Sequence, residues 1–169
     1  HYQVTNLIVD PVMVSKSGYP LLQKEAIQAL KTHLIPKALL VPPNIHEAEI
    51  LAGMKIQNLT EARQAAKVIQ TLGCRHVLIK GGHFREKPAM DLFYDGRFFR
   101  MYPGEFIETS HTHGTGCTYA SAIAANLAKG KALPDAIEAS KRYITAAIRH
   151  SLAIGHGNGP TNHFYFLPQ

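Results

Sequence analysis

The stretch HGTGCTYASAIAANLAKG, residues 113–130, places a glycine-rich turn directly before a run of helix-forming residues. Main-chain N–H groups in such a turn, together with those of the first helical residues, can surround an anionic oxygen. The same arrangement puts the Cys117 side chain at the positive end of the helix dipole, where a thiolate is favoured. The segment therefore predicts an anion-binding turn with a cysteine able to act as nucleophile or base. The alternative is a close-packed helix start in which Cys117 is a small buried apolar residue.

Outward from this turn, segments of strand and helix character alternate along the chain. The segments with strand character are Leu7–Val9, Leu39–Val41 and His76–Lys80. Five helices are predicted, and the first two are Leu21–Leu34 and Glu47–Leu51. The third is capped by Thr60 and runs through Leu72, and the fourth runs from the glycine turn to about Lys129. The fifth starts near Pro134 and carries an apolar stripe of Ile137, Ile144, Ile148 and Leu152. A hairpin is predicted where Asp95-Gly96 joins Leu92–Tyr94 to Phe98–Met101. The pattern favours an α/β fold, with a helix-covered, mainly parallel sheet and an antiparallel β-hairpin.

Polar side chains follow the predicted strands, and ligands of open sheets bind beyond the carboxyl ends of their strands. Asp10 can hold Mg²⁺ through water or orient a hydroxyl group, or it can cap a local Asp-Pro turn. Asn44 and Glu47 have the spacing of a capping box, and they could also order the waters of Mg²⁺ near a triphosphate. Lys80, before two glycines, could balance phosphate charge or simply face solvent.

Composition narrows the class of protein. The 169 residues carry a net charge of +6 and are 46% hydrophobic, with a sequence pI of about 9.4, so the surface attracts polyanions such as nucleotides. Lysines and arginines are scattered, which does not favour a nucleic-acid partner. The apolar runs are shorter than the ~18 residues that span a bilayer, so no membrane partner is expected.

Two cysteines give no disulfide framework and fit a reduced cytoplasmic setting, with Cys74 in the core. Because a strand follows His1 almost at once, we expect preceding residues that this sequence does not include.

The order of the motifs gives a resemblance. In chain order they are Asp10-Pro11-Val12, Asn44-x-x-Glu47, Lys80-Gly81-Gly82-His83 and Gly114-Thr115-Gly116-Cys117. This set, the phrase at residues 9–18 and the tail at residues 157–164 resemble the hydroxymethylpyrimidine/phosphomethylpyrimidine kinases of the ribokinase-like superfamily. The resemblance implies a three-layer sandwich with helices on both faces of the sheet. Residues 1–169 would then form the C-terminal part of one kinase domain, without its N-terminal portion.

The resemblance also implies a reaction, with ATP and Mg²⁺ as cofactors. The γ-phosphoryl group of ATP would pass to the hydroxymethyl oxygen of 4-amino-5-hydroxymethyl-2-methylpyrimidine, and a second ATP would phosphorylate the monophosphate. The resemblance implies an anion hole at Gly114, Thr115 and Gly116, with Cys117 as the proton acceptor. It implies that Lys80 and Lys141 balance the phosphate charge and that Val12 contacts the pyrimidine. It also implies that Mg²⁺ is held through water by Asp10, Asn44 and Glu47. The family further implies a homodimer.

Two alternatives stay open at this stage. A pyridoxal kinase of the same superfamily shares the nucleotide chemistry, and the residues that distinguish its ring recognition lie mostly in the N-terminal portion. A non-catalytic nucleotide- or pyrimidine-binding relative would keep the fold without turnover, although the intact motif set argues against decay. A purely structural interaction protein would have no need of these polar residues.

Overall fold

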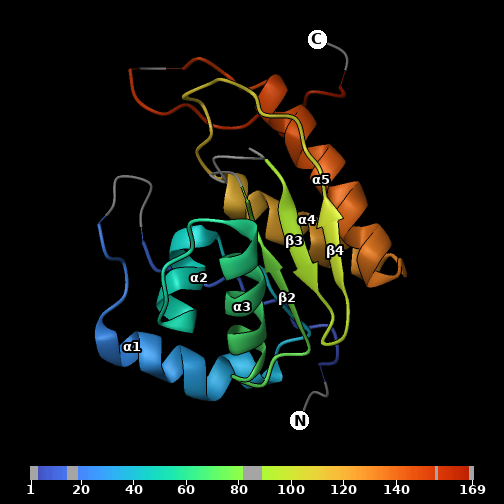
Figure 1. Ribbon diagram of the computed structural model, residues 1–169. Helices are drawn as coiled ribbons and strands as arrows, with labels where there is room; N and C mark the ends of the chain where they lie inside the picture. The colour runs from blue at the N-terminus through green and yellow to red at the C-terminus, as the bar shows by residue number, and fades with distance from the viewer. Residues whose placement is uncertain (1–3, 15–18, 82–88, 155, 168–169) are drawn as a thin grey trace. The chain divides into compact units, whose positions relative to one another are not determined.

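The computed structural model describes residues 4–14, 19–81, 89–154 and 156–167 (Figure 1). The chain divides into two compact units, His1–Pro103 and Gly104–Gln169. The first unit contains a sheet with its helices, and the second contains a pair of helices followed by a tail.

The sheet of the first unit has the strand order β1 (Leu40–Val41), β2 (His76–Ile79), β3 (Asp91–Tyr94) and β4 (Phe99–Tyr102). Strands β1 and β2 are parallel, whereas β2–β3 and β3–β4 are antiparallel. The predicted hairpin is thus present as β3 and β4, each displaced by one residue at one or both ends. Within the described residues the sheet is mixed, with its parallel part at the β1 side.

The first predicted strand is reduced to a short pairing. Ile8 forms an isolated parallel bridge with Leu40, and the Val9 N–H donates to the Leu40 carbonyl at 3.0 Å. This pairing continues the parallel part of the sheet and brings the chain to Asp10 at the same edge as the ends of β1 and β2.

The first helical segment differs from its prediction. Helix α1 (Lys24–Ala29) continues as a π-helical turn, η1 (Leu30–Leu34), and a 3₁₀ turn, η2 (Ile35–Lys37). Pro36 lacks an N–H and its ring clashes with the preceding turn of an α-helix, so a regular helix cannot run through it. The predicted segment Leu21–Leu34 therefore starts three residues too early and misses the change of helix type.

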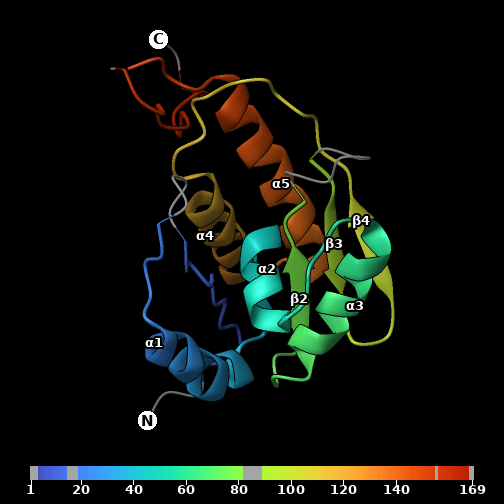
Figure 2. The ribbon, with the colours of Figure 1, turned by 60° about the vertical axis from the view of Figure 1, so that its left-hand side comes forward.

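Helices α2 (Ile45–Ala52) and α3 (Leu59–Gln70) follow β1. The predicted cap of α3 at Thr60 is wrong, because the side chain of Asn58 accepts the Glu61 N–H at 3.0 Å and the helix begins at Leu59. Helix α3 lies against β2 and β3, and α2 packs against α3 (Figure 2). The small residues on the buried face of α3 allow this close packing; they are Ala62, Ala65 and Ala66.

The core of the first unit joins these helices to the sheet. Its strand residues include Val41, Val77, Ile79 and Leu92, which are fully buried. Cys74 belongs to the same cluster, as predicted, and burial raises the pKa of its thiol to about 11. Cys74 is therefore an inert core residue.

The second unit is built on α4 (Thr115–Ala128) and α5 (Leu133–Arg149), which pack along each other. The predicted apolar stripe of α5 is confirmed at Ile137 and Ile144, which are buried. The predicted stripe also includes Leu152, and this part of the prediction is wrong, because Leu152 lies beyond the helix end and is 39% exposed. In the described part of the chain, no helix combines the length and apolar character needed to cross a membrane.

Candidate functional site

An ion pair joins the ends of two segments of the first unit. The Lys80 ammonium lies 3.0 Å from Oδ1 of Asp10, and the two side chains are 13% and 16% exposed. Lys80 continues the line of β2, because its N–H donates to the Pro43 carbonyl at 2.8 Å and it forms a parallel bridge with Asn44. Lys80 is therefore not solvent-facing, and among the described residues the Asp10 carboxylate pairs with Lys80. The ion pair fixes the ammonium group at the carboxyl edge of the parallel strands.

Asn44 and Glu47 form the capping box that their spacing predicts. Oδ1 of Asn44 accepts the Glu47 N–H at 2.9 Å, and Oε2 of Glu47 accepts the Asn44 N–H at 2.7 Å. Glu47 is only 3% exposed, and this burial raises the pKa of its carboxyl group. Lys80 opposes the shift and Asp10 adds to it, so both charges act on Glu47. The four side chains therefore form one strand-end cluster.

The strand-end cluster offers Mg²⁺ oxygen atoms of the kind that it prefers. Its donors are the carboxylates of Asp10 and Glu47 and the amide of Asn44, and the described residues contain no group of three or more His, Cys, Asp or Glu placed to hold a metal. That Asp10, Asn44 and Glu47 order the waters of Mg²⁺ stays a prediction.

The other predicted residues of the first unit have varied positions. Val12 lies two residues beyond Asp10, is 38% exposed, and donates its N–H to the Asp10 carbonyl at 2.9 Å. The main-chain N–H of Gly81 donates to the Asp91 side chain. Gly82 and His83, like residues 15–18 of the first motif, lie outside the described residues.

Asp91 is a residue that sequence reasoning missed. It is 2% exposed at the start of β3, and its Oδ1 accepts the Gly81 N–H at 3.0 Å. This bond fixes the main chain directly after Lys80. The available signal was an acidic residue at the head of an apolar strand, which usually marks only the edge of a loop.

In the second unit, the glycine-rich turn leads into α4 as predicted. Gly114 is the N-cap residue, with φ 82° and ψ −2°, a left-handed conformation that favours glycine. The first i→i−4 hydrogen bond of α4 runs from the Thr118 N–H to the Gly114 carbonyl at 2.9 Å. The N–H groups before Thr118 therefore have no acceptor within the regular helix. No acidic residue occupies the first turn, and the Thr115 N–H donates to the Thr112 carbonyl at a long 3.4 Å.

Cys117 and Lys141 lie on the two packed helices of this unit. Cys117 is exposed as a thiol in the first turn of α4, so the alternative of a buried cysteine is wrong. Lys141, on α5, is half-buried, and its Nζ lies 5.8 Å from the centre of the Tyr119 ring. Helix α5 therefore places a cation beside the second turn of α4.

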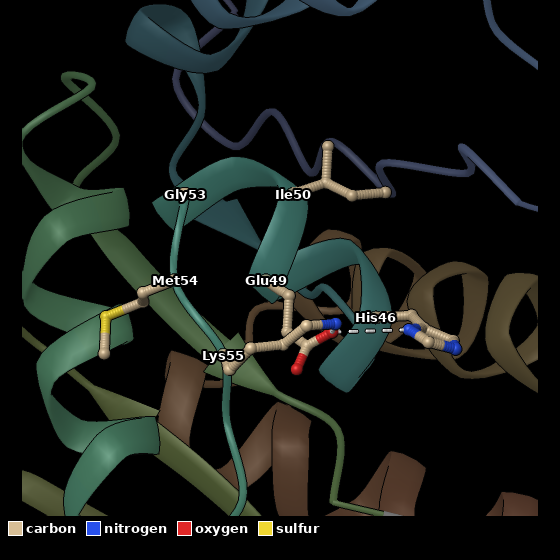
Figure 3. Close-up of a pocket in the computed structure, with 6 residues that line it drawn as sticks. All are labelled: His46, Glu49, Ile50, Gly53, Met54 and Lys55. Carbon is tan, nitrogen blue, oxygen red and sulfur yellow. Dashed lines mark hydrogen bonds and ion pairs between the residues drawn. The ribbon is translucent and has the colours of Figure 1, made fainter.

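A shallow hollow of about 340 Å³ lies beside α2, lined by His46, Glu49, Ile50, Gly53, Met54 and Lys55 (Figure 3). Within it the Glu49 carboxylate accepts the Ile56 N–H at 2.9 Å and pairs with Lys55 at 3.1 Å and His46 at 3.5 Å. None of the predicted site residues lines this hollow. Its carboxylate is engaged by neighbouring side chains, so the hollow is not part of the candidate site.

Comparisons with known proteins agree with this arrangement. The family described as phosphomethylpyrimidine kinase matches residues 1–162. A hydroxymethylpyrimidine/phosphomethylpyrimidine kinase of Bacillus subtilis (strain 168) is 44% identical to the chain, over 98% of the chain and 61% of the relative. The chain thus spans less than two thirds of the length of this curated relative.

Solved structures give the same result for the fold. An ADP complex of Bacillus subtilis pyridoxal kinase has a TM-score of 0.87 and 38% identity, covering 97% of this chain and 61% of that one. A phosphomethylpyrimidine kinase from Clostridium difficile 630 has a TM-score of 0.73 and 42% identity, covering 85% and 58%. The predicted ribokinase-like α/β fold is therefore confirmed. With its family match over nearly the whole chain, this polypeptide belongs to the phosphomethylpyrimidine kinase family.

Proposed function

We propose that the protein containing this chain phosphorylates 4-amino-5-hydroxymethyl-2-methylpyrimidine with ATP, and then converts the monophosphate to the diphosphate with a second ATP, as a step of thiamine biosynthesis. The family membership and the Bacillus subtilis relative of that name support the proposal. The observation that carries it is the start of α4, where a left-handed glycine and main-chain donors stand next to an exposed cysteine.

Phosphoryl transfer depends on alignment and charge compensation more than on covalent chemistry. The main-chain N–H groups at Gly114, Thr115 and Gly116 would take the oxygens of the transferring group. Donors of this kind stabilise a developing negative charge best when they are already oriented toward it. The turn therefore supplies the electrostatic part of the proposed catalysis.

The charged side chains would balance the remaining phosphate charge. Lys80 is held in place by its bond to Asp10, and Lys141 is held above Tyr119. Asp10, Asn44 and Glu47 would order the waters of Mg²⁺, which when bound shields the negative charge of the triphosphate. Because Lys80 and Asp10 pair with each other, neither charge is left unpaired at this partly buried position.

Cys117 would take the proton from the substrate hydroxyl group as it attacks. The helix start favours the thiolate form, and the exposed position of the side chain leaves it accessible to a substrate. Val12, which is exposed next to Asp10, would contact the pyrimidine ring.

The test is to incubate the intact protein with ATP and each candidate substrate, and to follow phosphorylated products by ³¹P NMR. The expected result is phosphorylation of the hydroxymethylpyrimidine and then of its monophosphate, at a higher kcat/KM than for pyridoxal. Failure to phosphorylate the pyrimidine, with active turnover of pyridoxal, would favour the second candidate function.

That second candidate, a pyridoxal kinase, is supported by the high similarity to the Bacillus subtilis pyridoxal kinase structure. A non-catalytic relative would bind a nucleotide without turning over either compound. Assembly as a homodimer and a cytoplasmic location stay predictions, and light scattering on the intact protein would test the first of them.

A further inference from the structure

The tail motif at residues 157–164 has no place yet in the proposed function. Its main chain pairs with the residue that precedes the cap of α4. The His113 N–H donates to the Gly159 carbonyl at 3.1 Å, the Thr161 N–H donates to the His113 carbonyl at 3.4 Å, and His113 forms a parallel bridge with Pro160. The tail segment, residues 157–162, therefore lies alongside the approach to Gly114.

The tail segment is also fixed on its other side. The Leu152 N–H donates to the Pro160 carbonyl at 3.2 Å, and the Asn162 N–H donates to the Ala147 carbonyl of α5 at 3.0 Å. Thr161 and Asn162 are buried, with 3% and 9% exposure. The segment thus connects the end of α5 to the beginning of α4.

One side chain completes this connection. Nδ1 of His111 accepts the Gly159 N–H at 3.0 Å. Because a main-chain N–H can only donate, Nδ1 carries no proton, and the imidazole is neutral with its proton on Nε2. The imidazole ring packs closely against Gly159. A Cβ at this position would clash with the Leu152 carbonyl oxygen and lie 2.5 Å from Nδ1 of His111. Position 159 therefore needs glycine for the two groups to meet.

We propose that His111 is a positioning residue for the anion-binding turn. Its neutral imidazole holds the tail segment against residues 111–113, and this attachment sets the direction of the N–H groups that begin α4. Glycines at positions 114 and 116 leave the turn little stiffness of its own, so its geometry depends on the chain that leads into it. The inference rests on the proposed function for its ligand, a nucleoside triphosphate.

The experiment compares two substitutions of His111 in the intact protein. In His111→Asn, the side-chain oxygen can still accept the Gly159 N–H, whereas His111→Leu leaves this buried N–H without an acceptor. His156→Asn, at an exposed histidine near the same tail, is the matched control. Calorimetry with AMP-PCP gives the affinity, and thermal unfolding shows that each variant is folded.

The expected result is that His111→Leu weakens AMP-PCP binding about ten-fold, while His111→Asn stays within about three-fold of the wild type. His156→Asn should bind like the wild type. Wild-type affinity in a folded His111→Leu protein would overturn the inference, and so would an equal loss in both His111 variants.

Amide hydrogen exchange at Gly159 separates this inference from the proposed function. Exchange should be faster in His111→Leu than in His111→Asn, and equal rates would show that the hydrogen bond does not hold the tail. If the wild-type protein binds no AMP-PCP at all, the proposed function fails, and the attachment of the tail is then judged by the exchange rates alone.

Discussion

The anion-binding turn and the strand-end cluster are built in different ways. The turn uses contiguous residues, 113–118, and the groups that we propose for ligand binding are neutral main-chain donors. The cluster brings together Asp10 and Lys80, which are 70 positions apart and bond to each other through their charged side chains. The turn is contiguous in the sequence, although the tail segment pairs with the chain that leads into it, whereas the cluster exists only once the sheet has formed.

Because of this difference, substitutions in the two regions should affect turnover and the free energy of unfolding differently. Replacing Cys117 leaves the main-chain donors of the turn in place, so its loss should appear mainly in turnover. A side chain in the cluster has a structural partner, so its loss should appear in both activity and the free energy of unfolding.

The largest effect is expected for Cys117→Ala. Loss of the proton acceptor should lower turnover roughly 10²- to 10⁴-fold, the usual contribution of a general base, and leave AMP-PCP affinity within about three-fold. Steady-state kinetics and calorimetry measure the two quantities. Unchanged turnover would reject a catalytic thiol. Retained activity in Cys117→Asp would indicate that any nearby proton acceptor suffices.

Lys80→Met should raise KM for ATP about ten-fold or more and also destabilise the fold by about 1–3 kcal/mol, because Asp10 is left partly buried without its partner. Lys55→Met is the control: its ammonium lies 3.1 Å from Glu49 but is 79% exposed. That exposed pair should contribute no more than about 1 kcal/mol and leave KM unchanged. Urea unfolding gives the stabilities, and equal losses in the two variants would contradict the assigned role of Lys80.

Asn44→Ala and Asn58→Ala remove equivalent helix caps. Each asparagine accepts an N–H three residues ahead, at 2.9 Å and 3.0 Å, and each loss should cost about 1 kcal/mol of stability. Only Asn44 belongs to the strand-end cluster, so only Asn44→Ala should also reduce kcat/KM. If turnover falls equally in both variants, the effect comes from the helix caps and not from the site.

The smallest effect is a pH dependence at Glu47. Burial raises the pKa of its carboxyl group in the folded protein above the ordinary value of 4.5. The stability that the protonated group contributes is then fully present below pH 4.5 and is lost as the pH rises through the folded pKa. Relative to wild type, Glu47→Gln should therefore gain stability as the pH rises from 4 to 7. Parallel stability curves from urea unfolding at pH 4, 5, 6 and 7 would contradict this.

Local patterns allowed several features to be predicted from the sequence. The glycine turn before α4, the capping box of Asn44 and Glu47, and the hairpin at Asp95-Gly96 each depend on residues a few positions apart. Their geometry is set by turn chemistry and by hydrogen bonds within one or two turns of the chain. Such features are therefore visible without the fold.

Partners distant in the sequence could not be predicted. The Lys80–Asp10 bond, the hold of Asp91 on Gly81 and the contact of His111 with Gly159 all require the chain to be folded first. The π-helical turn η1 also escaped prediction, because apolar spacing alone does not distinguish it from an α-helix. The predicted site residues were thus found one by one, while their pairing came from the structure.

The role of the α4 start can be measured by amide NMR on the intact protein, titrated with AMP-PCP and, separately, with ADP. If the main-chain N–H groups hold the γ-phosphate, the Gly114, Thr115 and Gly116 amides should shift strongly with AMP-PCP and much less with ADP. Saturation with AMP-PCP that moves other amides but leaves these three unchanged would contradict an anion-binding turn at this position.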